Sequence, residues 1–182
     1  MRILWGSIPL TSEYRINYET VMSKNTSQEI AISLYGKTPF LNANNANGGA
    51  AITNLRCEGL RFQYAYRFYL KGINRFLPPD GYYISPHFSY ATARFYDKTQ
   101  PRQRRDYIQV EHFDVNIFVG RQFVINRNLI FEIYAGGGYK KNRWFESYAN
   151  GVRRQVSIID FDYYNSNYRL HLGFNFGLGW NH

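Results

Sequence analysis

Bulky apolar residues alternate with small or polar residues, at a period of two, along most of this chain. From Leu60 to Leu70, every even position is Leu, Phe or Tyr, and the odd positions between them are Arg, Gln, Ala or Tyr. Successive side chains of a β-strand point to opposite faces of the sheet, so each such segment has one apolar face and one polar face. The pattern predicts an all-β protein and shows no helical spacing.

The alternation predicts seven strands. They lie near residues 12–22, 27–37, 60–70, 81–96, 106–124, 128–141 and 169–180. Pro86 falls inside one of them, and because proline cannot donate to a ladder, we expect a β-bulge there.

The connections between these strands alternate in length. Those at 23–27, 71–80 and 124–128 are short, whereas those at 38–57, 97–105 and 141–167 are long or polar. Short turns at one end and long loops at the other are typical of outer-membrane barrels, whose short turns are periplasmic. Such barrels have an even number of strands. We therefore expect an eighth strand before Thr11, within residues 1–8.

Composition fits a strand-built membrane protein. The chain has 182 residues, 19% of them aromatic, and no run of 18 apolar residues, which excludes transmembrane helices. A closed barrel also satisfies every backbone polar group inside a membrane. We expect residues 1–182 to form one domain, a closed antiparallel up-and-down transmembrane β-barrel of eight strands in the outer membrane. No secretory signal is visible, so we expect a mature form or a missing true start.

A soluble calycin-type barrel has a similar size, with its apolar residues inside. The large aromatic faces and the glycines of the last strand favour lipid outside and a polar interior filled by side chains. The polar faces also carry balanced charge, which indicates a network of ion pairs in the interior. The cations are Arg15, Arg61, Arg67, Lys140 and Arg169, and the carboxylates are Glu13, Glu19, Glu29, Asp114 and Glu132. His171 shares this inner face.

Three segments carry a family resemblance. Residues 12–19, 129–139 and 171–180 resemble the uncharacterised small outer-membrane barrel proteins of Bacteroidota. The last segment also resembles the signal read by the barrel-assembly machinery, although Asn181 and His182 follow the final aromatic residue. The resemblance implies an outer-membrane location and an eight-stranded barrel, and it carries no catalytic residues to transfer.

The sequence offers little chemistry. His87, His112 and His171 share the inner face with Asp114 and Glu132, a combination that could bind metal or catalyse proton transfer. We expect these residues to satisfy one another instead. The glycine run at 136–138 lacks the Lys-Ser/Thr of a phosphate loop. We therefore expect no enzymatic activity, no metal and no cofactor.

The net charge of +9 must lie on loops and rims if the interior is neutral. Arg102, Arg104 and Arg105 make one loop basic, which fits either the phosphates of lipopolysaccharide or plain solvation. Too many strands are aromatic for a nucleic-acid platform, so we expect no nucleic acid as a partner.

Aromatic residues also crowd the segment before the last strand. Trp144, Phe145 and Tyr148, near two arginines, are typical of protein contact sites, or they continue the strands above the membrane. Arg94, Gln109 and Glu111 fall on the lipid-facing parity, so we expect them in a hairpin that projects outward.

Three functions remain open at this stage. The first is an accessory or structural subunit of a larger outer-membrane complex for nutrient uptake, secretion or barrel assembly, in contact with lipids and other outer-membrane proteins. The second is an outer-membrane enzyme that acts on lipid or peptide at the outer rim. The third is a soluble carrier of a small apolar ligand.

Overall fold

The computed structural model describes residues 2–7, 13–36, 55–70, 78–97, 106–125, 128–148, 150–156 and 167–180. Within these ranges lie nine strands: β1 (Arg2–Ser7), β2 (Glu13–Ser23), β3 (Thr26–Tyr35), β4 (Leu55–Tyr69), β5 (Gly81–Asp97), β6 (Tyr107–Ile125), β7 (Leu129–Ser147), β8 (Arg153–Val156) and β9 (Tyr168–Trp180). No helix in the described part is long and apolar enough to cross a membrane.

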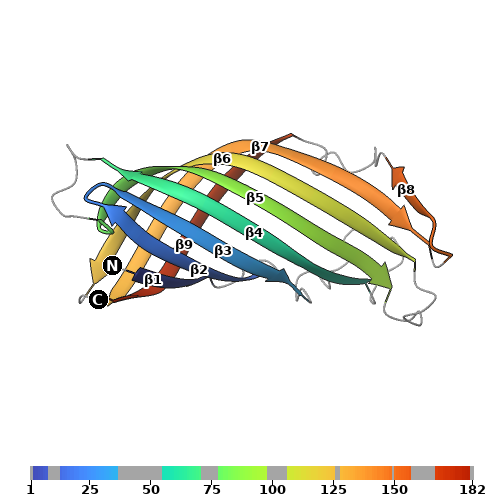
Figure 1. The fold of residues 1–182 in the computed structure, drawn as a ribbon, viewed down its shortest axis with the longest axis horizontal. Helices are drawn as coiled ribbons and strands as arrows, with labels where there is room; N and C mark the ends of the chain where they lie inside the picture. Colours follow the sequence, from blue (N-terminus) through green and yellow to red (C-terminus); the bar gives the residue numbers. More distant parts are fainter. Residues whose placement is uncertain are drawn as a thin grey trace, which may run out of the picture.

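Eight of the strands pair antiparallel in chain order. β1 to β7 form consecutive ladders, β7 pairs with β9, and β9 pairs with β1. The ladders therefore return to β1, and each of these eight strands has a hydrogen-bonded neighbour on both sides (Figure 1). The prediction of an antiparallel up-and-down sheet with eight strands is confirmed, including a first strand before Thr11.

The strands are longer than predicted on the side of the long loops. β7 runs to Ser147, and β8 pairs with its end from Trp144↔Val156 to Ser147↔Arg153. The prediction of a loop over 141–167 is therefore wrong for this hairpin. The residues of the β7–β8 hairpin do not follow the alternation of a lipid-facing strand, because a strand outside the lipid needs no apolar face.

Pro86 does not cause the predicted bulge. The β4–β5 ladder stops at Ala65↔His87 and resumes in the same register at Phe68↔Ile84. On the other side, Pro86 pairs in register with Ile117. The missing proline N–H is thus accommodated by a gap in one ladder, and the described strands shift register at Val21/Ser23 instead.

Both chain termini lie at the end of the ring that carries the short connections (Figure 1). There the β2–β3 turn contains only Lys24 and Asn25, and the Asn25 N–H donates to Ser23 Oγ over 3.2 Å. The β7–β8 hairpin lies at the opposite end, where β3 and β5 end and β4 and β6 begin (Figure 1). We call these the short-turn end and the long-loop end.

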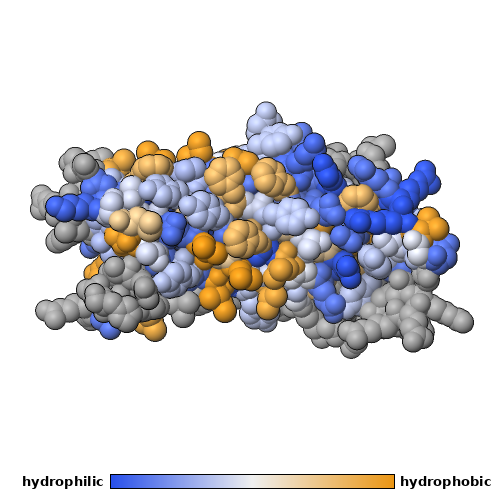
Figure 2. Space-filling model, viewed as in Figure 1, coloured by the Kyte–Doolittle hydropathy of each residue, from blue (hydrophilic) through white to orange (hydrophobic). Residues whose placement is uncertain are grey.

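The two faces of the ring differ sharply in chemistry. The outward positions of β2 to β7 and β9 carry exposed Tyr, Phe, Ile, Leu and Val, with Leu172 88% exposed and Ile117 61% exposed. The inward positions carry the buried polar residues. Figure 2 shows apolar side chains over the middle of one face and hydrophilic ones toward the long-loop end.

Glycines permit close packing on one wall of the interior. A Cβ at Gly136 would collide with the Ile117 carbonyl oxygen and the Phe118 ring, and one at Gly173 would collide with the Tyr134 ring. Both aromatic rings therefore occupy space that a side chain at the glycine would need.

Cysteine pairs across the first and last strands test the ring. Leu4 and Leu178 are Cα partners in the β1–β9 ladder, at a spacing that suits a disulfide. With the single native cysteine removed by Cys57→Ser, we expect Leu4→Cys and Leu178→Cys to oxidise to a bridge, measured by mass spectrometry. The control, Leu4→Cys with Gly177→Cys, points its thiols to opposite faces and should stay reduced. Equal yields in the two pairs would contradict the register.

Candidate functional site: the polar interior

Arg67 is the centre of an ion cluster near the short-turn end. It comes from the inner face of β4, is 4% exposed, and contacts carboxylates on three other strands. Its Nη1 lies 2.6 Å from Glu19 Oε2, and its Nη2 lies 2.9 Å from Glu132 Oε1. Nη2 also forms an ion pair with Glu29. One guanidinium therefore joins β2, β3 and β7 across the ring.

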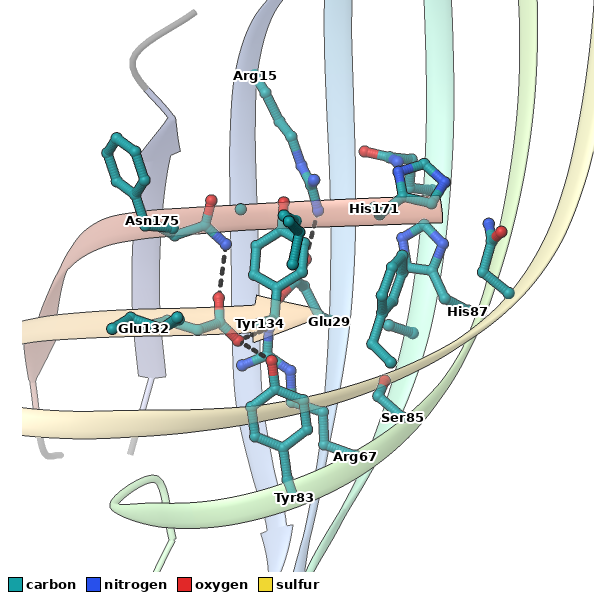
Figure 3. Close-up of a pocket in the computed structure, with 18 of the residues that line it drawn as sticks. Arg15, Glu29, Arg67, Tyr83, Ser85, His87, Glu132, Tyr134, His171 and Asn175 are labelled. Atoms are coloured by element: carbon teal, nitrogen blue, oxygen red, sulfur yellow. Dashed lines mark hydrogen bonds and ion pairs between the residues drawn. The ribbon is translucent and has the colours of Figure 1, made fainter. Parts of the chain in front are cut away.

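Neutral donors complete the coordination of these carboxylates. Gln122 Nε2 donates to Glu19 Oε2 over 2.8 Å, and the Tyr69 hydroxyl donates to Glu19 Oε1 over 3.0 Å. Figure 3 shows Glu132 between Tyr83 and Asn175, and both donate to it. Glu19, Gln122 and Glu132 have no exposed surface. Buried carboxylates require such partners, so the cluster seals this end of the interior.

The strand register forces the cluster to include a cation. Glu19 and Glu29 are direct partners in the β2–β3 ladder, where like charges repel. Arg67 lies against both, and Arg15 Nη2 lies 2.9 Å from Glu29 Oε1. These two arginines offset the repulsion between Glu19 and Glu29 and hold both carboxylates in place.

A ring of aromatic and histidine side chains follows toward the long-loop end. The edge of Phe118 meets His87 at 5.1 Å, His171 at 5.3 Å and Tyr134 at 5.4 Å between ring centroids. These side chains come from β5, β6, β7 and β9. They form an apolar layer above the ion cluster.

Asp114 organises the next layer. Ser89 Oγ donates to its Oδ2 over 2.8 Å, and His112 Nε2 lies 2.6 Å from its Oδ1. Arg61 and Arg169 approach Oδ2 at 3.5 and 3.9 Å. Lys140 is the ladder partner of Asp114 and is also buried.

The interior is not filled by side chains, which corrects the prediction of a plugged lumen. A cavity of about 800 Å³ extends from the Arg67 cluster to Asp114, and its lining also includes outward residues of β7 and β9 such as Ile133 and Leu172. Its lining includes Ala65, Ser85 and Gly173, which are too small to reach the middle of the ring. The alternation shows which face is polar but does not show whether the opposing side chains meet.

The remaining predicted site residues lie outside the interior ion clusters or outside the described part of the chain. Glu13 belongs to β2, and its side chain lies outside the described part. Arg102, Arg104 and Arg105 also lie outside the described residues. Trp144 and Phe145 are in β7, where the Arg153 guanidinium lies 3.9 Å from the Phe145 ring, and Tyr148 follows this strand.

Arg94, Gln109 and Glu111 lie in the far parts of β5 and β6, as predicted for a projecting hairpin. Arg94 pairs with Gln109 in the ladder, and Glu111 forms an ion pair with Arg153 at 3.0 Å. Polar partners on the outward face at this end are consistent with a surface that water covers.

Sequence reasoning missed several members of the interior. Tyr69, Tyr83, Gln122 and Asn175 all donate to the cluster carboxylates, and Phe118 is the centre of the aromatic layer. Their inner parity is visible in the alternation, but only charge marks a residue of that face as one that needs a partner. No group of three or more His, Cys, Asp or Glu among the described residues could hold a metal ion.

Comparison with known proteins supports the fold. No family model matches the chain, and no curated protein matches it. The structure is similar to the crystal structure of a major outer membrane protein from Thermus thermophilus, with a TM-score of 0.55 and 10% identity over 97% of each chain. At this identity, the likeness shows a similar fold and nothing finer.

Removing the Arg67 side chain should leave three buried carboxylates without their shared cation. We expect Arg67→Ala to lower the free energy of unfolding by about 3–5 kcal/mol, measured by urea titration in detergent micelles. Arg67→Ala combined with Glu132→Gln should lose less than the single change, because fewer charges are stranded.

The matched control is Arg94→Ala on the outward face of β5, where the guanidinium lies 5.2 Å from the Tyr107 ring centroid. An exposed contact of this kind contributes about 0.5–1 kcal/mol. A loss at Arg67 no larger than the loss at Arg94 would contradict the central role of the cluster.

Proposed function

We propose that this chain is a non-enzymatic, integral outer-membrane protein whose eight paired strands close into a membrane-spanning barrel. The observation that carries the proposal is the contrast between the two faces of the ring. Exposed apolar residues occur on the outward face of β2 to β7 and β9, while charged residues are buried inside. Lipid is the environment that makes this arrangement favourable.

Closure is supported by the ladders. β1 pairs with both β2 and β9, and β6 pairs with β7, so each strand of the ring has its backbone groups opposite a neighbour on both sides. A membrane offers no water to an open sheet edge, and closure removes both edges. The likeness to an outer membrane protein adds to this argument.

The short-turn end is proposed to face the periplasm and the long-loop end to face outward. At the short-turn end, the Arg121 guanidinium lies 4.7 Å from the Tyr82 ring centroid and donates to the Tyr82 hydroxyl over 2.9 Å. Aromatic and arginine side chains of this kind suit a membrane interface.

The two rival functions have less support. A soluble calycin carries an apolar interior, whereas the interior here holds Glu19, Glu132 and Arg67. An enzyme at the outer rim would need reactive groups there. The interior carboxylates are instead held by arginines in the middle of the ring and near its short-turn end, which suits a structural role.

We further propose that the protein is an accessory subunit of a larger outer-membrane complex, with lipopolysaccharide as a lipid contact and with Bacteroidota as its source. The hairpin of β7 and β8 supports the accessory role. It extends beyond the ring, with Trp144 and Phe145 half-buried and Tyr148, Arg153 and Arg154 exposed. Aromatic residues and arginine are enriched in protein interfaces.

An arginine placed on the outward face tests whether that face contacts lipid or water. Ile117 is 61% exposed in the middle of β6, and Ile125 is 44% exposed on the same outward face at the short-turn end of the strand. We expect Ile117→Arg to cost about 2–4 kcal/mol in a bilayer and the control Ile125→Arg to cost about 0–1 kcal/mol, measured by folding into lipid vesicles.

The native protein should also fractionate with outer membranes and migrate faster unboiled than boiled on a denaturing gel. Recovery as a soluble periplasmic monomer, with Ile117→Arg harmless, would contradict the proposed location.

The accessory role predicts partners that depend on the hairpin. We expect purification in mild detergent to recover other outer-membrane proteins, and Trp144→Ser with Phe145→Ser to lower their recovery at least fivefold, because the aromatic contact area is lost. The gel shift of the variant serves as the control for folding. Unchanged recovery of every partner would remove this hairpin from the proposal.

A further inference from the structure

We propose that the cavity inside the ring is a binding site for a small organic anion, namely a carboxylate on a planar apolar body. The inference rests on the closed barrel of the proposed function but concerns a site that the accessory role does not use. Three observations support it: the shape of the cavity, its unsatisfied polar groups and the distribution of its charges.

The cavity is sealed at one end. Glu19, Gln122 and Ile130 lie at the short-turn end of the ring and have no exposed surface. Toward the long-loop end, the exposed fraction of the inward side chains rises to 15% for His112 and 37% for Arg169. The interior therefore resembles a cup. The cavity of about 800 Å³, which also reaches outward residues of β7 and β9, is in the size range of small-molecule sites.

Buried polar atoms in the wall of the cup have no hydrogen-bond partner. They include His87 Nδ1 and His171 Nε2, and both residues line the cavity. His87 is 5% exposed. Figure 3 shows His87 and His171 on the same side of the pocket, away from Glu132. Leaving such groups unpaired is costly, so a ligand that hydrogen-bonds to them gains affinity.

Charge inside the ring is segregated. Among the described side chains, Glu19, Glu29 and Glu132 at the sealed end are paired with Arg67 and Arg15. Three cations, Arg61, Lys140 and Arg169, surround the single carboxylate of Asp114. The described part of the open half therefore carries more positive than negative charge.

The wall also offers apolar ring surface. Phe118 and Tyr134 line the cavity beside the two histidines, with their rings inclined at 74° to each other and set against Gly136 and Gly173. A planar body can lie against one of these rings while its anionic group reaches Arg169 and the unpaired imidazole nitrogen of His171. The cations and the rings together select an aromatic carboxylate over a sugar or a cationic solute.

The test uses 4-fluorobenzoate as the probe and 4-fluorobenzylamine as the charge-reversed control. Fluorine NMR titrations are run with the full chain folded in an uncharged detergent, and again with protein-free micelles. We expect saturable binding of the benzoate and at least tenfold weaker binding of the amine. Arg169→Gln should weaken benzoate binding at least fivefold, because the most exposed cation of the cup is lost.

Two further variants separate the effect of cavity space from the effect of an exposed positive charge. Ala65→Leu fills part of the cavity without changing its charge and should also weaken binding at least fivefold. Arg153→Gln removes an exposed cation outside the ring and should leave binding unchanged. Each variant is first shown to keep the mobility shift between unboiled and boiled samples.

Several outcomes would overturn the site. They are a probe shift no larger than in empty micelles, equal binding of the amine, and losses that are the same for Arg153→Gln as for Arg169→Gln. Any of these with a normal mobility shift leaves the barrel intact and removes only the ligand site. Failure of the wild-type chain to show the mobility shift would instead overturn the proposed function.

Discussion

Pairing of backbone N–H and C=O groups around the full circle of strands is the constraint on which the rest of this structure depends. Because β1 is bound on one side by β2 and on the other by β9, the two ends of the chain hold the ring together. In the proposed membrane setting, an unpaired edge would cost several kcal/mol per backbone group, and these ladders give each of the eight strands a partner on both sides. Strand alternation then assigns every side chain to one of two environments, and a register shift of one residue would reverse them all.

Burial of charge follows from this assignment. A narrow ring places the inward residues of facing strands within reach of one another, so the repulsion between Glu19 and Glu29 has to be relieved from across the interior. Arg67 does this from β4 and reaches Glu132 on β7 as well. A guanidinium suits this role because its donors diverge in a plane and can serve several carboxylates at once. Lysine, with one compact ammonium group, could not hold the same three strands together.

The sequence predicted the number, order and facing of the ring strands because period two and lipid exposure are properties of single strands. It predicted which charged residues face inward, yet it could not show that Arg67 is the hub, since this depends on which strands face each other across the ring. It left open that Trp144 and Phe145 continue a strand, as they do in β7, but it missed β8, where no lipid demands alternation. It also missed Tyr69, Tyr83 and Gln122, whose hydroxyl and amide groups matter only in three dimensions. The cavity was also missed, because side-chain length along one strand does not give the width of the interior.

Charge balance over the whole interior conceals an asymmetry along its axis. Counting the inward residues gives near neutrality, but the carboxylates gather near the short-turn end and the cations gather around Asp114. Separation of the charges creates a field along the cup, and the glycines beneath Phe118 and Tyr134 keep the space between the two ends open. A barrel that needed only to be stable would gain by filling that space, because packed side chains contribute dispersion and the removal of apolar surface from water. The retained cavity therefore supports a use for the interior beyond holding the wall together.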